Sequence, residues 1–174
     1  SSAASDVYKR QPVTWIDTSD MDFKEEFVGE TFGRINKEEA HLLLKELEAY
    51  ILRIGGSRIL EERIDFGLIS PYKAQVQYLR GKIKGSATLR PYRSLITVNT
   101  VDGFQGQERD VIFISLVRAN EEGQIGFLND LRRMNVAITR ARMKLVILGE
   151  AATLGHHAFY KQLLEYVKKV NGRQ

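Results

Sequence analysis

The feature that most constrains the fold is a polar, glycine-punctuated stretch, residues 100–110, that lies between two short apolar runs. The runs cover residues 95–98 and 111–117, and both are predicted to be buried strands, because short apolar segments bounded by turn residues are typical of them. The polar stretch is then a loop at the end of a strand, where open α/β sheets bind their ligands. The sequence therefore predicts an α/β domain with a candidate site in this loop.

A second stretch, residues 131–142, has a helical period. Its predicted apolar stripe consists of Leu128, Leu131, Met134, Ile138 and Ala141. Arg133 and Arg140 are seven residues apart and are predicted to share a different face of the same helix. Because the planar guanidinium offers a fork of donors, it suits phosphate, although both arginines could instead form structural ion pairs.

The remaining chain alternates strands and helices. Further strands are predicted at residues 13–17, 64–70 and 144–148, and helices at residues 36–54, after Pro71 and at residues 157–170. Residues 18–32, 85–93 and 118–124 are expected to be loops. Asn36 is a good N-cap with Glu39 at the capping-box position. This alternation predicts a mostly parallel sheet covered by helices on both faces.

The 174 residues have the length of one domain. Residues 1–11 are small and polar and are expected to be a tag-like or disordered N-terminus, which leaves residues 12–174 as the domain. The net charge of +4 permits an anionic partner without requiring one. The chain has no cysteine, no apparent signal peptide and no apolar run of membrane-spanning length. We therefore expect no membrane partner and a cytoplasmic or nuclear, intracellular location.

Both polar stretches resemble the fifth and sixth motifs of superfamily 1 nucleic-acid helicases, and the match is closest to the branch that contains the nonsense-mediated-decay RNA helicase. A segment near Pro71 also matches the fourth region of that family. The residues that carry the resemblance are Ile69-Ser-Pro-Tyr-Lys-Ala-Gln-Val76, Val101-Asp-Gly-Phe-Gln-Gly-Gln-Glu108, Ile125-Gly-Phe-Leu-Asn-Asp130 and Arg132-Arg-Met-Asn-Val-Ala-Ile-Thr-Arg-Ala141.

The resemblance implies a three-layer RecA-like domain of the P-loop NTPase kind, the second of two that bind ATP between them. It implies that Arg140 is the catalytic arginine finger at the γ-phosphate and that Glu108 contacts the ribose of the nucleotide. Gly106 and Arg133 are also implied to lie at the nucleotide. The likeness of the helix start at Asn36 adds a nucleotide-side role for Glu39. Alternatively, Glu108 could pair with Arg109 on the surface, and Glu39 could serve the capping box alone.

The resemblance also implies a track for single-stranded DNA or RNA, with Gln105 and Arg133 coupling the two sites. The implied track residues are Ser70, Pro71, Tyr72, Thr100, Val101 and Asp102. The alternative for Asp102 and Gln105 is that they are turn residues bonded to their own backbone. Phosphate contacts carry no base information, so the motifs do not distinguish DNA from RNA.

The chain carries no G-x-x-x-x-G-K-[ST] stretch, no paired acidic residues at the end of an apolar strand, and no metal-ligand set. We therefore expect ATP and Mg²⁺ to be held together with a missing N-terminal RecA-like domain, and the isolated chain to be inactive. A further γ-phosphate arginine of the family would precede residue 12, so the chain is expected to be a domain of a larger helicase. The alternative function is a non-catalytic nucleic-acid- or protein-binding module; a dinucleotide-binding enzyme is disfavoured, because no G-x-G-x-x-G follows the first strand.

Overall fold

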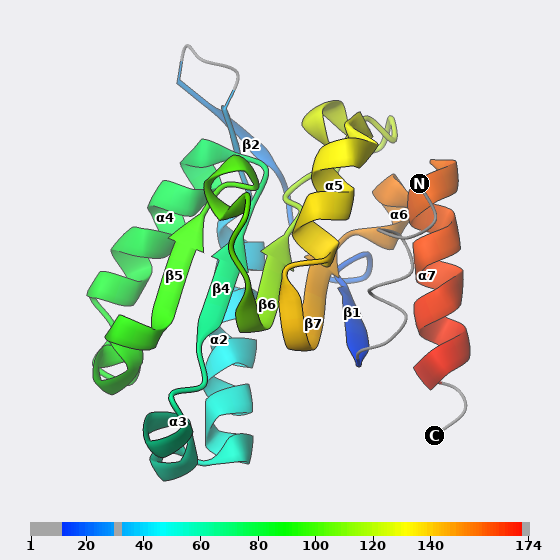
Figure 1. Ribbon diagram of the computed structural model, residues 1–174. Helices are drawn as coiled ribbons and strands as arrows, with labels where there is room; N and C mark the ends of the chain where they lie inside the picture. Colours follow the sequence, from blue (N-terminus) through cyan, green and yellow to red (C-terminus); the bar gives the residue numbers. More distant parts are fainter. Residues whose placement is uncertain (1–11, 30–32, 172–174) are drawn as a thin grey trace.

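A computed structural model describes residues 12–29 and 33–171, so the expectation for residues 1–11 lies outside the described residues. In the described part, a sheet of five strands has the order β1-β7-β6-β4-β5, and every neighbouring pair is parallel. The predicted α/β fold with a parallel sheet is confirmed (Figure 1). The strands are β1 (Val13–Asp17), β4 (Phe66–Ile69), β5 (Ile96–Asn99), β6 (Arg109–Ser115) and β7 (Ala141–Gly149).

The helices cover both faces of this sheet because successive strand residues point to opposite sides. Phe66, Val111 and Phe113 pack with α2 (Lys37–Ile54), α3 (Gly56–Glu62) and α4 (Lys73–Lys84). Ile112, Ile114 and Ile147 pack with α5 (Leu131–Ile138) and α7 (Ala158–Asn171) on the other side. In Figure 1, α2 lies behind the sheet and α5 in front of it, so the predicted three layers are confirmed. The short α6 (Ala151–Leu154) follows β7.

Residues 18–32 were expected to be a loop, and that expectation is wrong in part. The strand β2 (Glu26–Val28) pairs antiparallel with β3 (Gly33–Ile35), and this hairpin stands apart from the main sheet. The helix α3 after Gly55 and three short 3₁₀ helices were also not predicted. The latter are η2 (Arg90–Leu95), η3 (Asp102–Phe104) and η4 (Gly126–Asn129).

The start of α2 confirms the predicted N-cap but not the capping box. The side chain of Asn36 accepts a hydrogen bond from the backbone N–H of Glu39 at 3.1 Å. The backbone N–H of Asn36, however, donates to Oε1 of Gln75 at 3.0 Å rather than to Glu39. The carboxylate of Glu39 instead accepts hydrogen bonds from Ser115 and Val117 at the end of β6, which are distant from it in sequence.

The helix of the second polar stretch is shorter than its sequence period predicts. It ends at Ile138, and β7 already begins at Ala141, where it pairs with Arg109 of β6. The prediction that Arg133 and Arg140 share one helix face is therefore wrong, because Arg140 lies in the connection between α5 and β7. Pairing across the sheet overrides the helical period at these residues.

Candidate functional site

The loop at residues 100–108 connects two opposite ends of the sheet. Both β5 and β6 run parallel to β4, so the chain leaves β5 at its carboxyl end and must cross the α5 face to enter β6 at its amino end. On the way, Phe104 is fully buried, and its ring packs directly over the backbone of Gly67. The candidate residues consequently form two groups, one at each end of the strands.

The first group lies at the carboxyl ends of β4 and β5. The predicted track residues Ser70, Tyr72 and Val101 are buried, while Pro71 and Thr100 are half-buried and Asp102 is exposed. The exposed edge of this group is therefore made by Pro71, Thr100 and Asp102. The whole group is held together by local bonds, such as the one from the Tyr72 N–H to Oγ of Ser70 at 3.3 Å.

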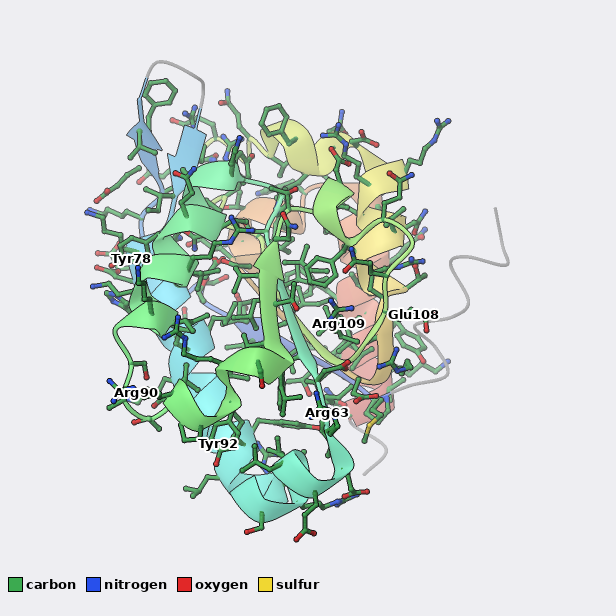
Figure 2. The ribbon with its side chains drawn as sticks, turned by 60° about the vertical axis from the view of Figure 1, so that its left-hand side comes forward. Arg63, Tyr78, Arg90, Tyr92, Glu108 and Arg109 are labelled. Carbon is green, nitrogen blue, oxygen red and sulfur yellow. The ribbon has the colours of Figure 1, made fainter. Side chains whose placement is uncertain are left out.

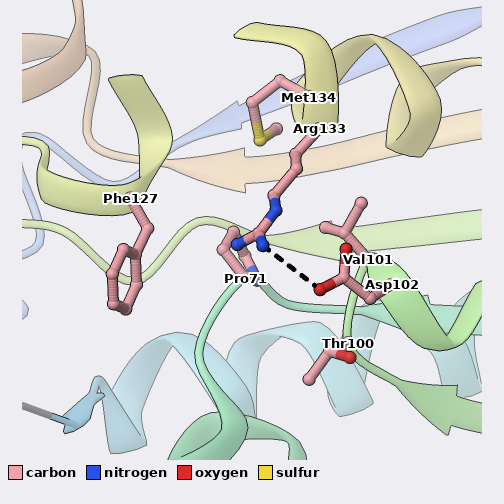
Figure 3. A pocket seen from close by; sticks show the side chains of 7 residues that line it. All are labelled: Pro71, Thr100, Val101, Asp102, Phe127, Arg133 and Met134. Carbon is pink, nitrogen blue, oxygen red and sulfur yellow. Dashed lines mark ion pairs between the residues drawn. The ribbon is translucent and has the colours of Figure 1, made fainter. Parts of the chain in front are cut away.

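A small pocket joins this group to α5 (Figure 3). Its volume of about 20 Å³ has room for a water molecule and not for a nucleotide. Its lining consists of Pro71, Thr100, Val101, Asp102, Phe127, Arg133 and Met134. A second, open pocket nearby is lined in part by Gln105, Asp102 and Arg133, so the structure brings the two predicted coupling residues to one surface.

Arg133 stands in the first turn of α5 and forms two ion pairs. Its Nη2 lies 3.4 Å from Oδ2 of Asp102, and its Nε lies 3.5 Å from Oδ2 of Asp130. Figure 3 shows the guanidinium reaching from α5 across the pocket to Asp102. Because all three side chains are about half exposed, these pairs add little to stability.

The second group lies at the amino ends of β6 and β7, around Arg140. The guanidinium of Arg140 donates to the carbonyl of Val136 at 3.1 Å, the carbonyl of Gln107 at 3.4 Å and Oγ1 of Thr139 at 3.3 Å. All three acceptors are neutral. Within residues 12–29 and 33–171, no carboxylate forms an ion pair with Arg140.

Glu108 and Gly106 are exposed in the loop whose Gln107 carbonyl accepts from Arg140. The alternative that Glu108 pairs with Arg109 is not what the structure shows, because Arg109 donates to the Glu108 backbone carbonyl at 2.7 Å and the Glu108 carboxylate lies 3.9 Å from Arg142. Figure 2 shows Glu108 and Arg109 side by side near the amino ends of the strands. Gly106 adopts φ +75°, a left-handed conformation that favours glycine.

Arg142, the neighbouring arginine, forms ion pairs with two aspartates. Its guanidinium contacts Oδ1 of Asp65 at 3.2 Å and Oδ1 of Asp110 at 3.1 Å. These two aspartates also exchange backbone bonds, since the N–H of each donates to the carboxylate of the other at 2.7 and 3.0 Å. Asp110 is therefore structural, because its carboxylate is held by Arg142 and by the backbone N–H of Asp65. Arg140, like Arg109 at the start of β6, forms no ion pair with a carboxylate of the described chain.

Sequence reasoning missed a buried polar cluster at the carboxyl end of β6. Oε1 of Glu39 accepts from Oγ of Ser115 at 2.6 Å and from the N–H of Val117 at 2.8 Å, while its Oε2 is buried with no hydrogen-bond partner among the described residues. Burial raises the pKa of Glu39 from 4.5 to about 7, against the lowering effect of these hydrogen bonds. The capping-box position was a signal for Glu39, but it pointed to the wrong partner.

The residues after β6 form an uncommon turn. Val117 has φ +72°, and the N–H of Arg118 donates to the carbonyl of Leu116 at 2.7 Å, which is a γ-turn with positive φ. The turn directs the buried Arg118 to Glu25, with Nε 3.0 Å from Oε2, and to the hydroxyl of Tyr72 at 3.2 Å. No pattern in residues 118–124 predicts this burial, because both partners are distant in sequence.

Two features are absent from the part of the chain that the structure describes. No group of three or more His, Asp or Glu side chains there is arranged to hold a metal ion. None of the described helices combines the length and the apolar character needed to cross a membrane.

The chain is similar in sequence to several known proteins. A family model described as an AAA domain matches residues 2–152. The probable helicase MAGATAMA 3 of Arabidopsis thaliana is 38% identical over 143 residues, which cover 82% of this chain and 17% of that protein. An uncharacterized ATP-dependent helicase of Methanocaldococcus jannaschii is 35% identical over 95% of this chain and 22% of its own length.

A third relative is the regulator of nonsense transcripts 1 homolog of Drosophila melanogaster, which is 38% identical over 83% of this chain and 12% of its own length. The chain thus spans about a fifth, or less, of the length of these curated relatives.

Proposed function

Since the chain belongs to the AAA domain family and is the C-terminal domain of a superfamily 1 helicase, we propose that it supplies one half of an ATP-driven motor on single-stranded nucleic acid. The observation that carries the proposal is the state of Arg140. Its guanidinium is held by three neutral acceptors and by no carboxylate of the described chain. A positioned, uncompensated guanidinium is suited to bind phosphate.

In this proposal Arg140 is the arginine finger. The bond from its Nε to the Val136 carbonyl fixes the guanidinium against the end of α5. When the domain closes on ATP bound to a first RecA-like domain, the guanidinium meets the γ-phosphate and stabilises the charge that develops during phosphoryl transfer. In well-measured GTPases such an arginine accelerates the reaction by about 10³–10⁵.

The residues around Arg140 fit the rest of a nucleotide. Glu108 follows Gln107, whose carbonyl accepts from Arg140, and its exposed carboxylate can accept from ribose hydroxyls. Gly106 leaves the loop surface open, because nothing lies within 4 Å of the place where a Cβ would stand. The P-loop and the Mg²⁺ ligands would be supplied by the first domain. This chain would contribute the finger, the ribose contact and one wall of the cleft.

The helix α5 would couple the nucleotide to the nucleic-acid track. Arg133 stands at its start, 3.4 Å from Asp102 at the carboxyl ends of the strands, and Arg140 follows its end. Eight helical residues span about 12 Å, so one rigid element connects the two groups. Binding of phosphate by Arg140 would shift α5. Through Arg133 and the nearby Gln105, that shift would move the edge formed by Pro71, Thr100 and Asp102.

The test is the Arg140→Ala variant of the full-length protein. We expect ATP turnover in the presence of saturating single strand to fall by about 10³ or more, while the affinity for the strand stays within a factor of about two. Arg140→Lys should restore little, because an ammonium cannot form the planar fork. The matched control is Arg90→Ala, which removes an exposed arginine from η2, on another part of the surface. Normal turnover in Arg140→Ala would overturn the assignment.

A non-catalytic nucleic-acid-binding module is the second candidate, and the open groove beside α4, lined by Lys73 and Arg80, favours it. In that case the full-length protein would bind single strands with an affinity that falls steeply with salt and is indifferent to ATP. A motor would instead change its affinity with the nucleotide state and turn over ATP only when the strand is present. The same measurement on DNA and on RNA would identify the track.

A further inference from the structure

Phe127 presents an aromatic ring to solvent at the centre of the carboxyl-end group. It is 52% exposed, although its neighbours Ile125 and Leu128 are buried. Its ring faces the buried ring of Tyr72, with 5.4 Å between centroids and an interplanar angle of 35°. Single exposed apolar side chains are common on protein surfaces, so exposure alone indicates nothing. What distinguishes Phe127 is that its ring lines three pockets of the surface.

Three hollows of the surface meet at Phe127. It lines the small pocket with Asp102 and Arg133, where Figure 3 shows its ring across from the Arg133 guanidinium. It also lines a hollow with Arg34 and Arg118. The third is an open groove of about 940 Å³. That groove extends from the β2–β3 hairpin over the start of α4 to the end of β5, and its lining includes Val28, Gly33, Lys73, Gln77, Arg80 and Asn99.

The turn that carries Phe127 is held in place by hydrogen bonds and by close packing. The hydroxyl of Tyr160 donates to the carbonyl of Leu128 at 2.6 Å, and the hydroxyl of Tyr72 donates to the carbonyl of Ile125 at 3.4 Å. Gly126 has φ +51°, and a Cβ there would lie 2.3 Å from Nη1 of Arg118. The turn therefore packs closely against Arg118, and a side chain at this place would be strained and would have to displace the guanidinium. A side chain held in this way loses little conformational entropy when it binds a ligand.

The charge around the ring suits a polyanion. Lys73 and Arg80 are exposed on the groove wall, and Arg80 is oriented by bonds from its guanidinium to the carbonyl of Val98 at 2.6 and 3.0 Å. The one carboxylate that lines the pockets around Phe127, among the described residues, is Asp102, which is paired with Arg133. An aromatic face beside a positively charged groove is the combination by which proteins bind single strands.

We propose that Phe127 is a base-stacking platform: a nucleobase of the single strand stacks on the exposed face of its ring while the adjoining phosphates lie against Lys73 and Arg80. The proposal rests on the proposed function, because it names how the track holds a base rather than the backbone alone. Stacking on a ring is tolerant of sequence, since every base has a π-face. Such a platform would hold the strand in register without selecting a sequence.

The test measures the affinity of the full-length protein for a fluorescently labelled oligothymidylate of about 12 nucleotides, and for the same strand with abasic sites throughout. Phe127→Ala should weaken binding of the thymidylate about 5- to 100-fold and leave the slope of affinity against salt unchanged. Lys73→Ala should lower that slope by about one phosphate contact. Leu52→Ala, which truncates a side chain 84% exposed on α2, is the control and should bind as the wild type does.

Two comparisons separate stacking from other roles of the ring. On the abasic strand, Phe127→Ala and the wild type should bind equally, because no base remains to stack. Phe127→Trp should keep the affinity, and Phe127→Leu, which keeps apolar bulk without a π-face, should lose it. A Phe127→Leu variant that binds as the wild type does, or an equal loss on both strands, would overturn stacking while the motor assignment stands. A wild-type protein that binds neither these strands nor an oligouridylate of the same length would overturn both.

Discussion

The backbone N–H of Val117 donates to Oε1 of Glu39 at 2.8 Å, and this bond connects the first turn of α2 to a left-handed residue at the end of the central strand β6. Nδ2 of Asn36, the N-cap of α2, donates to the carbonyl of Val117 at 3.1 Å, so the start of α2 holds both backbone polar groups of Val117. A β-branched residue with positive φ costs about 1–3 kcal/mol, and these bonds offset that strain. The turn then directs Arg118 beneath the Tyr72–Phe127 surface.

The first prediction concerns the pH dependence of stability at Glu39. Its pKa in the folded state, about 7, is above the ordinary 4.5, so between these values the folded state binds the proton more tightly than the unfolded state. The stabilisation from this proton is complete below about pH 4.5 and is lost as the pH rises through 7. Glu39→Gln cannot titrate. We expect it to be more stable than the wild type at pH 8, by up to about 3 kcal/mol, and nearly equal at pH 5.

Urea unfolding of the 174-residue chain at several values between pH 5 and pH 8 measures this difference. The control is Glu38→Gln, which changes the exposed neighbouring carboxylate and should shift stability little at any pH. A difference between Glu39→Gln and the wild type that does not vary with pH would contradict the assignment of the titration to Glu39.

The second prediction concerns the packing of the loop at residues 100–108 on β4. A Cβ at Gly67 would lie 2.6 Å from Cδ1 of Ile112 and 2.9 Å from Cε1 of Phe104. Gly67→Ala should therefore destabilise the domain by about 1–3 kcal/mol and displace Phe104. At Gly81, in α4, nothing lies within 4 Å of an added Cβ, so Gly81→Ala should be neutral or stabilising by up to about 1 kcal/mol. Thermal unfolding of both variants checks the contrast, and equal stability would count against the packing.

The third prediction separates a functional Arg133 from a structural one. Its ion pair with Asp102 joins side chains that are 51% and 64% exposed, so Arg133→Gln and Asp102→Asn should each change the free energy of unfolding by less than about 1 kcal/mol. We expect strand-stimulated ATP turnover of the full-length protein to fall at least tenfold in Arg133→Gln. Arg58→Gln, which breaks an exposed pair on α3, is the control. A large loss of stability with normal turnover would instead make Arg133 structural.

The fourth prediction concerns Glu25, which accepts hydrogen bonds from Arg118, the Ala119 N–H and Asn120, and pairs with Arg34. Glu25→Ala leaves the buried Arg118 without its carboxylate, which should destabilise the domain by about 3 kcal/mol. Glu26→Ala is the matched control, because Glu26 is exposed and its pair with Lys37 spans 3.9 Å. Urea unfolding measures both, and a small effect of Glu25→Ala would show that water replaces the carboxylate around Arg118.

Much of the fold follows from local sequence patterns. The strand β1, the N-cap Asn36, the end of α2 at Ile54 and the start of α4 after Pro71 were all predicted within one or two residues. These features depend on hydrophobic period and on capping chemistry, which neighbouring residues decide. The end of α5 was mispredicted, because Ala141 pairs with Arg109 from another strand, and no local pattern contains that partner.

For the candidate site, the sequence by itself indicated which residues are candidates for chemistry: the loop around Asp102 and Glu108, the two arginines, and the segment from Ser70 to Tyr72. The tertiary structure alone decided how they are arranged. It placed Arg133 and Arg140 at opposite ends of α5, buried Ser70, Tyr72 and Val101, and exposed Phe127. It also brought Glu39 to Val117, 78 positions away. The reason is that burial and polar pairing depend on which distant segments pack together, and a local period specifies a face without specifying what covers it.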